Sequence, residues 1–281
     1  MNLADINTLK SLLLKEGFSF KKSLGQNFLI DPTVCPKMAE NSCNENTGVL
    51  EIGPGVGVLT RELSKRAKKV VAIELDERLK KILPKTLGDL ENVEVIFGDA
   101  IKLDLRKIIE EHFEGCESVS VCANLPYYIT SPIIMMLLES KLPITSITVM
   151  VQKEAAERLC AKVGSRDAGA VTVAVTYYAE KEILFTVDRS SFMPPPNVDS
   201  AVIKLSIRQE PPIKVSDEKR FFSLVKSAFA QRRKTLVNTV CNTQNIPKDK
   251  LKNILTTLEI KETVRGEELT IEQLAQISEM L

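Results

Sequence analysis

A polar tetrapeptide near the middle of the chain carries groups that could hold an exocyclic amine. Asn124 and Leu125 offer a side-chain amide oxygen and a backbone carbonyl, two acceptors that would draw an amine nitrogen toward tetrahedral geometry and free its lone pair. Pro126 would fix the turn that follows, and Tyr127 offers a face on which a planar ring can stack. On its own, such a tetrapeptide is more often a strand-ending turn with a packed tyrosine, so its weight depends on what precedes it.

A glycine-rich segment upstream suits a ligand that lies against bare backbone. EIGPGVG (51–57) follows an apolar run and precedes a helical pattern, and Gly53 and Gly55 let the turn tighten around a bound molecule. The spacing is ExGxGxG, which lacks the third glycine of the dinucleotide fingerprint GxGxxG in its usual place. A glycine-rich turn without a ligand is the alternative that this segment alone leaves open.

Two further apolar runs end at acidic side chains. Glu74 closes the run VVAIE (70–74) some 20 residues past the glycines, where a carboxylate can accept hydrogen bonds from both ribose hydroxyls of a nucleoside. The alternative for Glu74 is a carboxylate at a helix N-terminus, a role that Asp76 could serve equally well. Asp99 follows the next run, in GDA (98–100).

The elements that would position these residues alternate between short β-branched runs and helical patterns from about residue 48 to residue 203. This alternation is typical of a wound α/β sheet, whose ligands bind at the carboxyl ends of the strands. We therefore expect four consecutive strand ends to bring the polar residues to one edge. Strands are predicted at 49–53, 70–74, 93–97, 119–125, 147–152, 182–187 and 201–207, and helices at 60–67 and 76–87.

Paired prolines in QEPPIK (209–214) indicate a linker, because they end the last strand and cannot start a helix directly. Only helical patterns follow. We predict a catalytic α/β domain at 1–207 and a small helical domain at 214–281. The Val/Ala/Tyr stretch after Ala170 fits either a helix or a strand.

Composition is ordinary for a soluble globular protein, with 281 residues, 44% hydrophobic and 27% charged. No apolar run approaches the roughly 20 residues that span a bilayer, and the N-terminus lacks a signal-peptide pattern. The six cysteines form no CxxC pair and His112 is the single histidine, so we expect no metal site and free thiols in the cytoplasm. Without a heptad seam, a monomer is expected.

The net charge of +1 argues only weakly against a nucleic-acid partner, because the charge is unevenly distributed. Residues 219–234 hold six cations and no anion, whereas 258–281 hold six glutamates and two cations. Cations in such a run would bind phosphates, although a solvated helix face is the commoner explanation. The predicted RNA contacts are Lys21, Lys22, Arg232, Arg233 and Lys234, and Lys162 and Arg166 could extend the same track.

Taken in order along the chain, these features predict methylation of the N6 amine of adenine. This amine is a poor nucleophile because its lone pair is delocalised into the ring, which the two acceptors at 124–125 would counter. A sulfonium methyl then moves by in-line displacement, so that alignment supplies most of the catalysis. The methylated ammonium is acidic and needs no strong base. A base inside a stem is out of reach, so the target lies in a loop or is flipped out.

The chain resembles the ribosomal RNA small-subunit dimethyladenosine transferases, the kasugamycin-resistance type. The resemblance implies a Rossmann-like class I S-adenosylmethionine-dependent methyltransferase domain followed by a small helical domain. The matching segments span nearly the whole chain in order: KKSLGQNFL (21–29), EIGPGVGVLT (51–60), VAIELD (71–76), GDA (98–100), NLPYYI (124–129), QKEAAERL (152–159), FMPPPNVDSAVI (192–203) and FAQRRKTL (229–236).

For the cofactor S-adenosylmethionine, the resemblance implies that Asn27 and Leu29 close over its methionine end. Gly53 would lie against it, Glu74 would hold its ribose, and Asp99 would bind its adenine amine.

For the target, the resemblance implies that Asn124 sits between cofactor and base, and that Phe192 stacks on the face opposite Tyr127. From the residues alone, a buried phenylalanine in a proline connector is an equal alternative for Phe192. The family's substrate is a pair of adjacent adenosines in the loop of the last helix of small-subunit (16S) rRNA, in an assembling subunit.

Three other functions remain open at this stage. A resistance methylase acting on large-subunit rRNA would share the catalytic domain, although the matches at 192–203 and 229–236 argue against it. A DNA adenine methyltransferase would need a separate target-recognition domain, and none is evident. A nucleic-acid-binding factor without catalysis would not need intact cofactor and Asn124–Tyr127 motifs.

Overall fold

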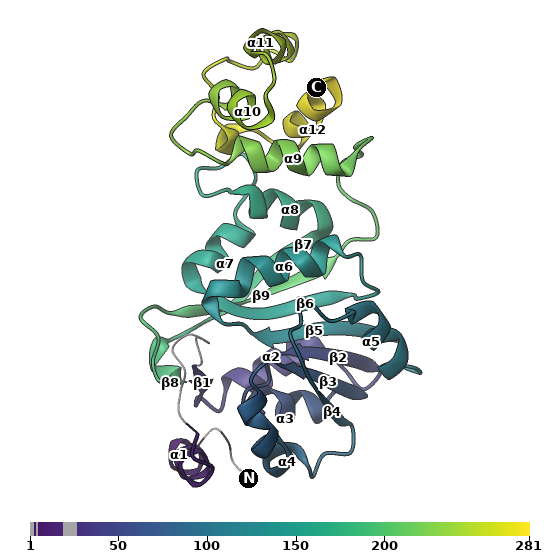
Figure 1. The fold of residues 1–281 in the computed structure, drawn as a ribbon, viewed down its shortest axis with the longest axis vertical. Coiled ribbons are helices and arrows are strands. Elements are labelled where there is room, and N and C mark those ends of the chain that lie inside the picture. The colour runs from purple at the N-terminus through teal and green to yellow at the C-terminus, as the bar shows by residue number, and fades with distance from the viewer. Residues whose placement is uncertain (1–2, 4, 19–26) are drawn as a thin grey trace. The chain divides into compact units, whose positions relative to one another are not determined.

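The structure is a computed structural model that describes residues 3, 5–18 and 27–281. It confirms the predicted α/β fold: seven strands form one sheet in the order β4-β3-β2-β5-β6-β9-β7 (Figure 1). Each of the seven predicted strands is present, with ends that differ from the prediction by up to three residues. They are β2 (Thr47–Ile52), β3 (Lys69–Glu74), β4 (Val93–Phe97), β5 (Ser118–Asn124), β6 (Ser146–Gln152), β7 (Ala179–Val187) and β9 (Ser200–Ile207).

The central strands are parallel, and their order reverses beside β2. Strand β2 pairs in parallel with β3 on one side and β5 on the other, and β4 and β6 extend the two sides. The chain runs outward from β2 to β4 and then returns to β5, so the connections diverge between β2 and β5. Such a reversal leaves a crevice at the carboxyl ends of the strands, where ligands of wound sheets bind.

Strand β9 runs antiparallel to β6, with Ser200 opposite Gln152. Since β6 ends at Gln152, the start of β9 lies at the carboxyl edge of the parallel strands. The segment that enters β9 therefore reaches the same edge as the glycine-rich turn. This segment carries β8 (Phe192–Met193), which pairs antiparallel with β1 (Phe28–Leu29) in a separate two-stranded sheet. The sequence patterns did not predict either short strand.

The stretch 76–87, predicted as one helix, forms two elements instead. A 3₁₀ helix, η2 (Glu77–Lys81), is followed by α4 (Leu83–Leu87). Pro84 lies in the first turn of α4. A proline has no N–H, and its ring would clash with the carbonyl four residues earlier, so a continuous helix cannot pass through this position.

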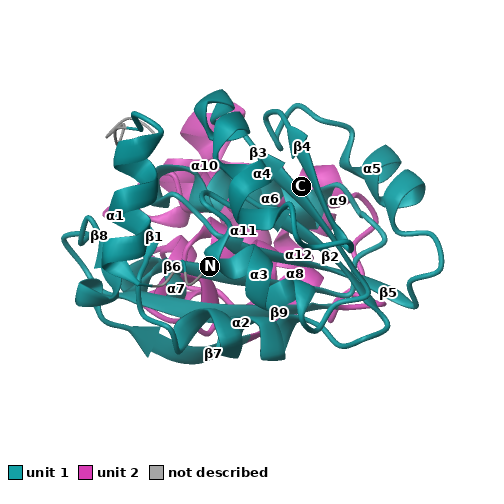
Figure 2. Cartoon of the chain, turned by 90° about the horizontal axis from the view of Figure 1, so that it is seen from below, with its two compact units in different colours: residues 1–156, 182–207 teal, residues 157–181, 208–281 magenta. Residues whose placement is uncertain are grey.

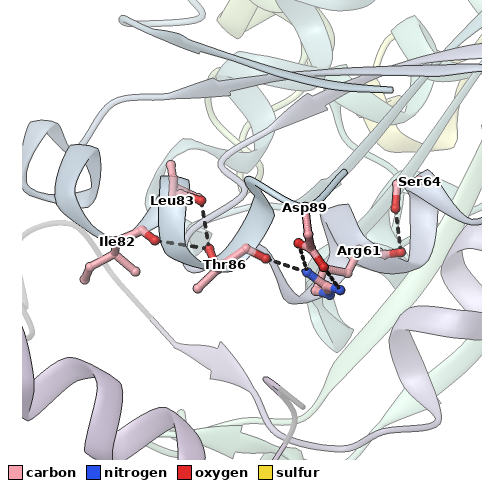
Figure 3. Close-up of polar contacts among 6 residues, drawn as sticks. All are labelled: Arg61, Ser64, Ile82, Leu83, Thr86 and Asp89. Carbon is pink, nitrogen blue, oxygen red and sulfur yellow. Dashed lines mark hydrogen bonds and ion pairs between the residues drawn. The ribbon is translucent and has the colours of Figure 1, made fainter. Parts of the chain in front are cut away.

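Helix α3 (Val58–Ser64), which begins directly after the glycine-rich turn, is attached to the end of α4 by one arginine (Figure 3). The Arg61 guanidinium donates to the Thr86 carbonyl oxygen at 2.6 Å and to both carboxylate oxygens of Asp89 at 2.7 and 2.9 Å. These bonds hold the pKa of Asp89 at about 2. The contact fixes the direction in which α3 leaves the turn.

The chain divides into two compact units, coloured separately in Figure 2. Unit 1 comprises residues 1–156 and 182–207, and unit 2 comprises 157–181 and 208–281. Residues 157–181, predicted to belong to the first domain, pack instead with the C-terminal helices. The reason is α8 (Ala170–Tyr178), the helical outcome of the ambiguous Val/Ala/Tyr stretch, whose apolar side chains need partners.

The core of unit 2 joins α8 to the C-terminal helices. Val173 and Tyr177 of α8 are buried in one cluster with Phe221. The Tyr177 ring centroid lies 5.0 Å from that of Tyr178 and 5.7 Å from that of Phe221. The Tyr178 hydroxyl donates to a Glu218 carboxylate oxygen at 2.5 Å. The C-terminal helices are α9 (Glu218–Ala228), α10 (Leu236–Gln244), α11 (Lys248–Thr257) and α12 (Ile271–Met280).

Five further α-helices complete those of the described residues. None of the helices within the described ranges combines the length and apolar character that crossing a membrane takes. These helices are α1 (Ile6–Lys15), α2 (Val34–Ser42), α5 (Leu105–His112), α6 (Thr130–Glu139) and α7 (Lys153–Cys160).

Replacing Phe221 with alanine should destabilise unit 2 by about 3–5 kcal/mol, because the ring is fully buried and its removal leaves a cavity. Urea unfolding of the full chain, followed by circular dichroism, measures this loss. Lys219→Ala, at an exposed position of the same helix, should change the free energy of unfolding by less than about 0.5 kcal/mol. Equal losses for the two variants would contradict the assignment of Phe221 to the core.

Candidate active site

A pocket opens at the carboxyl edge of the parallel strands, where the strand order reverses. The ends of β2, β3, β4 and β5 contribute to its wall, as do β1 and β8, and all its lining residues belong to unit 1. The structure thus brings together the predicted cofactor and catalytic residues from six separate segments. Those that line the pocket are Asn27, Leu29, Gly53, Gly55, Glu74, Asp99, Asn124, Leu125, Pro126, Tyr127 and Phe192.

The glycines of the turn after β2 have different roles. Gly53, Gly55 and Gly57 all have positive φ, at 74°, 59° and 93°, a backbone conformation that residues with a side chain rarely adopt. A Cβ at Gly53 would meet no atom within 4 Å, whereas one at Gly55 would lie 3.0 Å from the Phe28 ring and one at Gly57 would lie 2.7 Å from the Leu87 side chain. Gly53 therefore leaves room for a ligand, while the other two allow close packing.

Glu74 is buried at the end of β3, with 6% of its surface exposed, and backbone amides hold its carboxylate. One oxygen accepts from the Gly55 N–H at 3.0 Å and the other from the Asp76 N–H at 2.7 Å. Burial nevertheless raises the pKa of Glu74. The carboxylate is fixed in place before any ligand arrives, and each oxygen keeps a lone pair for a hydroxyl donor.

The neighbouring acid, Asp76, is a helix cap. Its side chain accepts from the Arg78 N–H at 3.1 Å and from the Arg78 guanidinium at 2.8 and 2.6 Å. The cap that was the alternative for Glu74 is thus made by Asp76. Asp99, after β4, accepts from the Ile101 N–H at 3.0 Å, and Lys102 lies 3.3 Å from its other oxygen.

The tetrapeptide 124–127 forms the adjoining wall. Asn124 is the last residue of β5, opposite Met150 of β6, and the Leu125 N–H donates to the Met150 carbonyl at 3.3 Å. Pro126 has extended backbone angles and turns the chain into the 3₁₀ helix η3 (Tyr127–Ile129). The Tyr127 and Ser200 hydroxyls lie 2.8 Å apart, which orients the half-buried ring, and burial raises its pKa.

Phe192 lines the pocket but is only 3% exposed. Its backbone pairs with Leu29, and its ring belongs to the core cluster that also holds Val202 and Met150. Its burial agrees with the alternative of a buried phenylalanine, and a role in stacking on the target base stays a prediction.

Those predicted RNA contacts that the structure describes do not line the pocket. Lys21 and Lys22 lie outside the described residues. Arg232, Arg233 and Lys234 belong to unit 2 and lie in an exposed turn before α10, not on the helix face that was considered for them. The helix starts later because Thr235 is its N-cap, accepting from the Asn238 N–H.

Glu51 is a pocket residue to which the motif analysis gave no role of its own. It is 1% exposed, and Oε2 has no hydrogen-bond partner among the described residues. Burial, together with a smaller effect of the Glu74 charge, raises its pKa to about 8. The available signal was the first letter of ExGxGxG, since an acid on a buried strand requires an explanation.

Two apolar side chains at the pocket were also missed. Leu75 directly follows β3 and Ile101 lies four residues after the end of β4; they are 49% and 47% exposed. They provide apolar surface beside the carboxylates of Glu74 and Asp99, as a planar ligand ring would need. Among the described residues, no group of three acidic, histidine or cysteine side chains is arranged to hold a metal ion.

Comparison with known proteins identifies the family. The model of the ribosomal RNA adenine dimethylase family matches residues 17–281. The chain belongs to this family. Two relatives carry the name ribosomal RNA small subunit methyltransferase A. The one from Geobacillus sp. is 48% identical, covering all of this chain and 98% of its own, and the one from Bacillus licheniformis is 49% identical, covering 97% and 94%.

Solved structures agree with this placement. A dimethyladenosine transferase from Plasmodium falciparum is 29% identical with a TM-score of 0.72, over 89% of this chain and 95% of its own. The 23S rRNA methyltransferase ErmE is 29% identical with a TM-score of 0.67, over 91% and 99%. The predicted family, class I methyltransferase fold and methyltransferase activity are confirmed, as is the cofactor, S-adenosylmethionine.

The residues of the pocket fit this cofactor. The buried carboxyl group of Glu51 has one unpartnered oxygen, and a ligand that carries positive charge would favour its ionised form. The open space at Gly53 leaves room for a ligand beside the backbone. Glu74 and Asp99 supply acceptors at successive strand ends, where ribose hydroxyls and an adenine amine would donate.

Glu51→Gln should remove a pH-dependent loss of stability from the free protein. Between pH 4.5 and about 8 the folded chain keeps a proton on Glu51 that the unfolded chain has released. The free energy of unfolding of the wild type should therefore fall as pH rises through this window, by at most about 1.4 kcal/mol per pH unit. Urea unfolding at pH 5, 6.5 and 8.5 should show a difference between variant and wild type that grows with pH.

The control is Glu45→Gln, which changes an exposed carboxyl in the same unit and should show no such trend. A difference between Glu51→Gln and wild type that stays constant with pH would contradict the raised pKa.

Proposed function

We propose that the chain dimethylates N6 of two adjacent adenosines in the loop of the 3′-terminal helix of small-subunit (16S) rRNA, in an assembling subunit. The observation that carries the proposal is the meeting of Asn124–Tyr127 with Gly53 and Glu74 in one pocket. The names of the relatives at 48% and 49% identity support the small subunit as the target. ErmE, which is named for 23S rRNA, is more distant at 29% identity.

In this proposal the wall at 124–127 activates the target amine. The Asn124 amide oxygen and the Leu125 carbonyl accept the two N6 hydrogens, which draws the nitrogen out of conjugation with the ring. Leu125 is 1% exposed and hydrogen-bonded to β6, so its carbonyl is held rigidly, as alignment of reacting atoms requires. When bound, S-adenosylmethionine supplies a methyl group on a sulfonium, which is open to in-line attack.

The aromatic residues position the base. The Tyr127 ring is held by its hydroxyl contact with Ser200 and would stack on one face of the adenine. Phe192 would stack on the other. Because Phe192 is almost fully covered, its ring must be uncovered as the base enters.

The basic turn of unit 2 would bind RNA phosphates. Arg232 donates to the Arg166 carbonyl at 2.7 Å, which places the exposed turn 231–234 beside the loop 162–167. Lys162 and Arg166 are exposed on that loop. These contacts support one continuous basic track on unit 2.

Asn124→Ala should lower methyl transfer to small subunits that lack these modifications by at least about 100-fold, the usual effect of removing one preorganised hydrogen-bonding group. Tritiated methyl incorporation, with mapping to N6 of the two loop adenosines, measures it. Asn253→Ala, at an exposed position in unit 2, is the matched control and should keep full activity.

Other outcomes of this assay separate the alternatives. Transfer by the wild type to large-subunit rRNA only would identify a resistance methylase. Cofactor binding without transfer to either RNA would indicate a binding factor.

Replacing Arg232, Arg233 and Lys234 together with alanine should weaken subunit binding and flatten its salt dependence. Each lost phosphate contact should reduce the slope of log K against log salt by about 0.7–0.9. Filter binding between 50 and 200 mM salt tests this. Alanine at Lys248, Lys250 and Lys252 of α11 removes the same charge elsewhere in unit 2, and an equal change of slope there would show that only net charge matters.

A further inference from the structure

Two segments that are far apart in the sequence, 28–30 and 191–193, form one hydrogen-bonded ribbon beside the pocket, the β1–β8 ribbon. In the small sheet, Phe28 lies opposite Met193 and Leu29 lies opposite Phe192. The pairing continues past the strands, because the Ile30 N–H donates to the Ser191 carbonyl at 2.8 Å. The segment expected to close over the cofactor is thus hydrogen-bonded to the segment expected to hold the target base.

A side-chain hydrogen bond also joins the two segments of the β1–β8 ribbon. The Ser191 hydroxyl donates to Asp31 Oδ2 at 3.1 Å. The other oxygen, Oδ1, accepts from the Thr33 N–H at 2.9 Å and from the Thr33 hydroxyl at 2.8 Å. These hydrogen bonds, those from Thr33 first, lower the pKa of Asp31, so that the carboxylate is charged at neutral pH and binds the hydroxyl strongly. Asp31 therefore joins the entry to α2 with the base-holding segment.

On the cofactor side, the β1–β8 ribbon contacts the glycine-rich turn. The Phe28 ring packs so closely on Gly55 that a Cβ there would lie 3.0 Å from it. Gly55 in turn donates its N–H to Glu74. A cofactor that displaces residues 27–29 on binding would move the Phe28 ring and, with it, the backbone of β1.

On the target side, the β1–β8 ribbon is connected to Tyr127 through hydrogen bonds. Ser191 ends the 3₁₀ helix η4 (Arg189–Ser191), whose first N–H donates to the Asp199 carboxylate at 3.1 Å. Ser200, the next residue, contacts the Tyr127 hydroxyl. Contacts thus run without a break from Gly55 through Asp31 and Ser191 to both aromatic residues of the base site.

We propose that Asp31 and Ser191 are positioning residues that couple the cofactor to the RNA: occupancy of the cofactor side fixes the segment that carries Phe192. This inference rests on the proposed function and deepens it. Linkage makes the coupling reciprocal, so the cofactor and the RNA tighten each other's binding by the same factor. The enzyme would then bind RNA more tightly when a cofactor is bound than when the cofactor side is empty.

The test measures the Kd of unmethylated small ribosomal subunits with and without saturating S-adenosylhomocysteine, which allows no turnover. The wild type should bind subunits at least about 5-fold more tightly with it, the lower end of usual coupling. Ser191→Ala should reduce this ratio toward 1, while its Kd for S-adenosylhomocysteine alone stays within about 2-fold of the wild type because no cofactor-lining side chain changes.

Thr33→Ala is the matched control, because it removes a hydrogen bond to the same carboxylate but leaves the Ser191 contact. It should keep the wild-type ratio, whereas a merely structural role would make the two variants alike. If Ser191→Ala does not fold, Asp31→Asn keeps the shape, weakens the bond and should give an intermediate ratio.

A wild-type ratio of 1, or a Ser191→Ala ratio equal to that of the wild type, would overturn the inference. Failure of the proposed function is seen separately, as wild-type protein that binds S-adenosylhomocysteine but transfers no methyl group from S-adenosylmethionine to these subunits.

Discussion

Strand β2 pairs in parallel with a neighbour on each side, and the positions of the functional side chains depend on this pairing. The register places Ile52 beside Ile73 of β3 and Ala123 of β5, so the residues that follow these three strands emerge at one level. Gly53, Glu74 and Asn124 are those residues or their immediate neighbours. A register slip of one residue in β3 or β5 would turn a site residue to the opposite face. The chemistry therefore depends on the backbone pairing of strands that contribute no catalytic side chain from their interiors.

The pocket places two acidic side chains where their ionised forms are disfavoured. Burial raises the pKa of both Glu51 and Glu74, and a neighbouring acid contributes to each shift, Glu74 for Glu51 and Asp76 for Glu74. A ligand with positive charge close to these carboxyl groups would favour their ionised forms.

Much of the fold was predictable because its signals are local. Each of the seven strands has five or more residues, and most of the first five are near-continuous apolar runs. The four strand ends carry glycine, acid or amide at recognisable spacing. β1 and β8 have two residues each, too few for any periodicity, and their pairing joins residues more than 160 positions apart. The break at Pro84 was visible in the sequence but was outweighed by the helical pattern around it.

The site was predictable in membership but not in environment. The family resemblance implies that Phe192 is near the target base, and Glu51 opens the motif ExGxGxG. Neither signal carries information on burial, which depends on packing from distant segments. That Phe192 is covered and that one Glu51 oxygen is unpartnered are three-dimensional facts. The position of Arg232–Lys234 in a turn followed from the cap at Thr235, a weaker signal than the charge run itself.

The division of unit 2 into two stretches has a consequence for synthesis of the chain. The sheet of unit 1 is complete once residue 207 has been made, because β9 ends there. Helix α8 is made earlier, but Val173 and Tyr177 pack against helices that the ribosome produces only afterwards. Unit 1 can therefore fold while the chain is still growing, whereas α8 must wait with its apolar side uncovered. In this interval the nascent chain exposes the apolar side of α8, a surface of the kind that chaperones bind. The exposure ends when the C-terminal helices emerge and cover it.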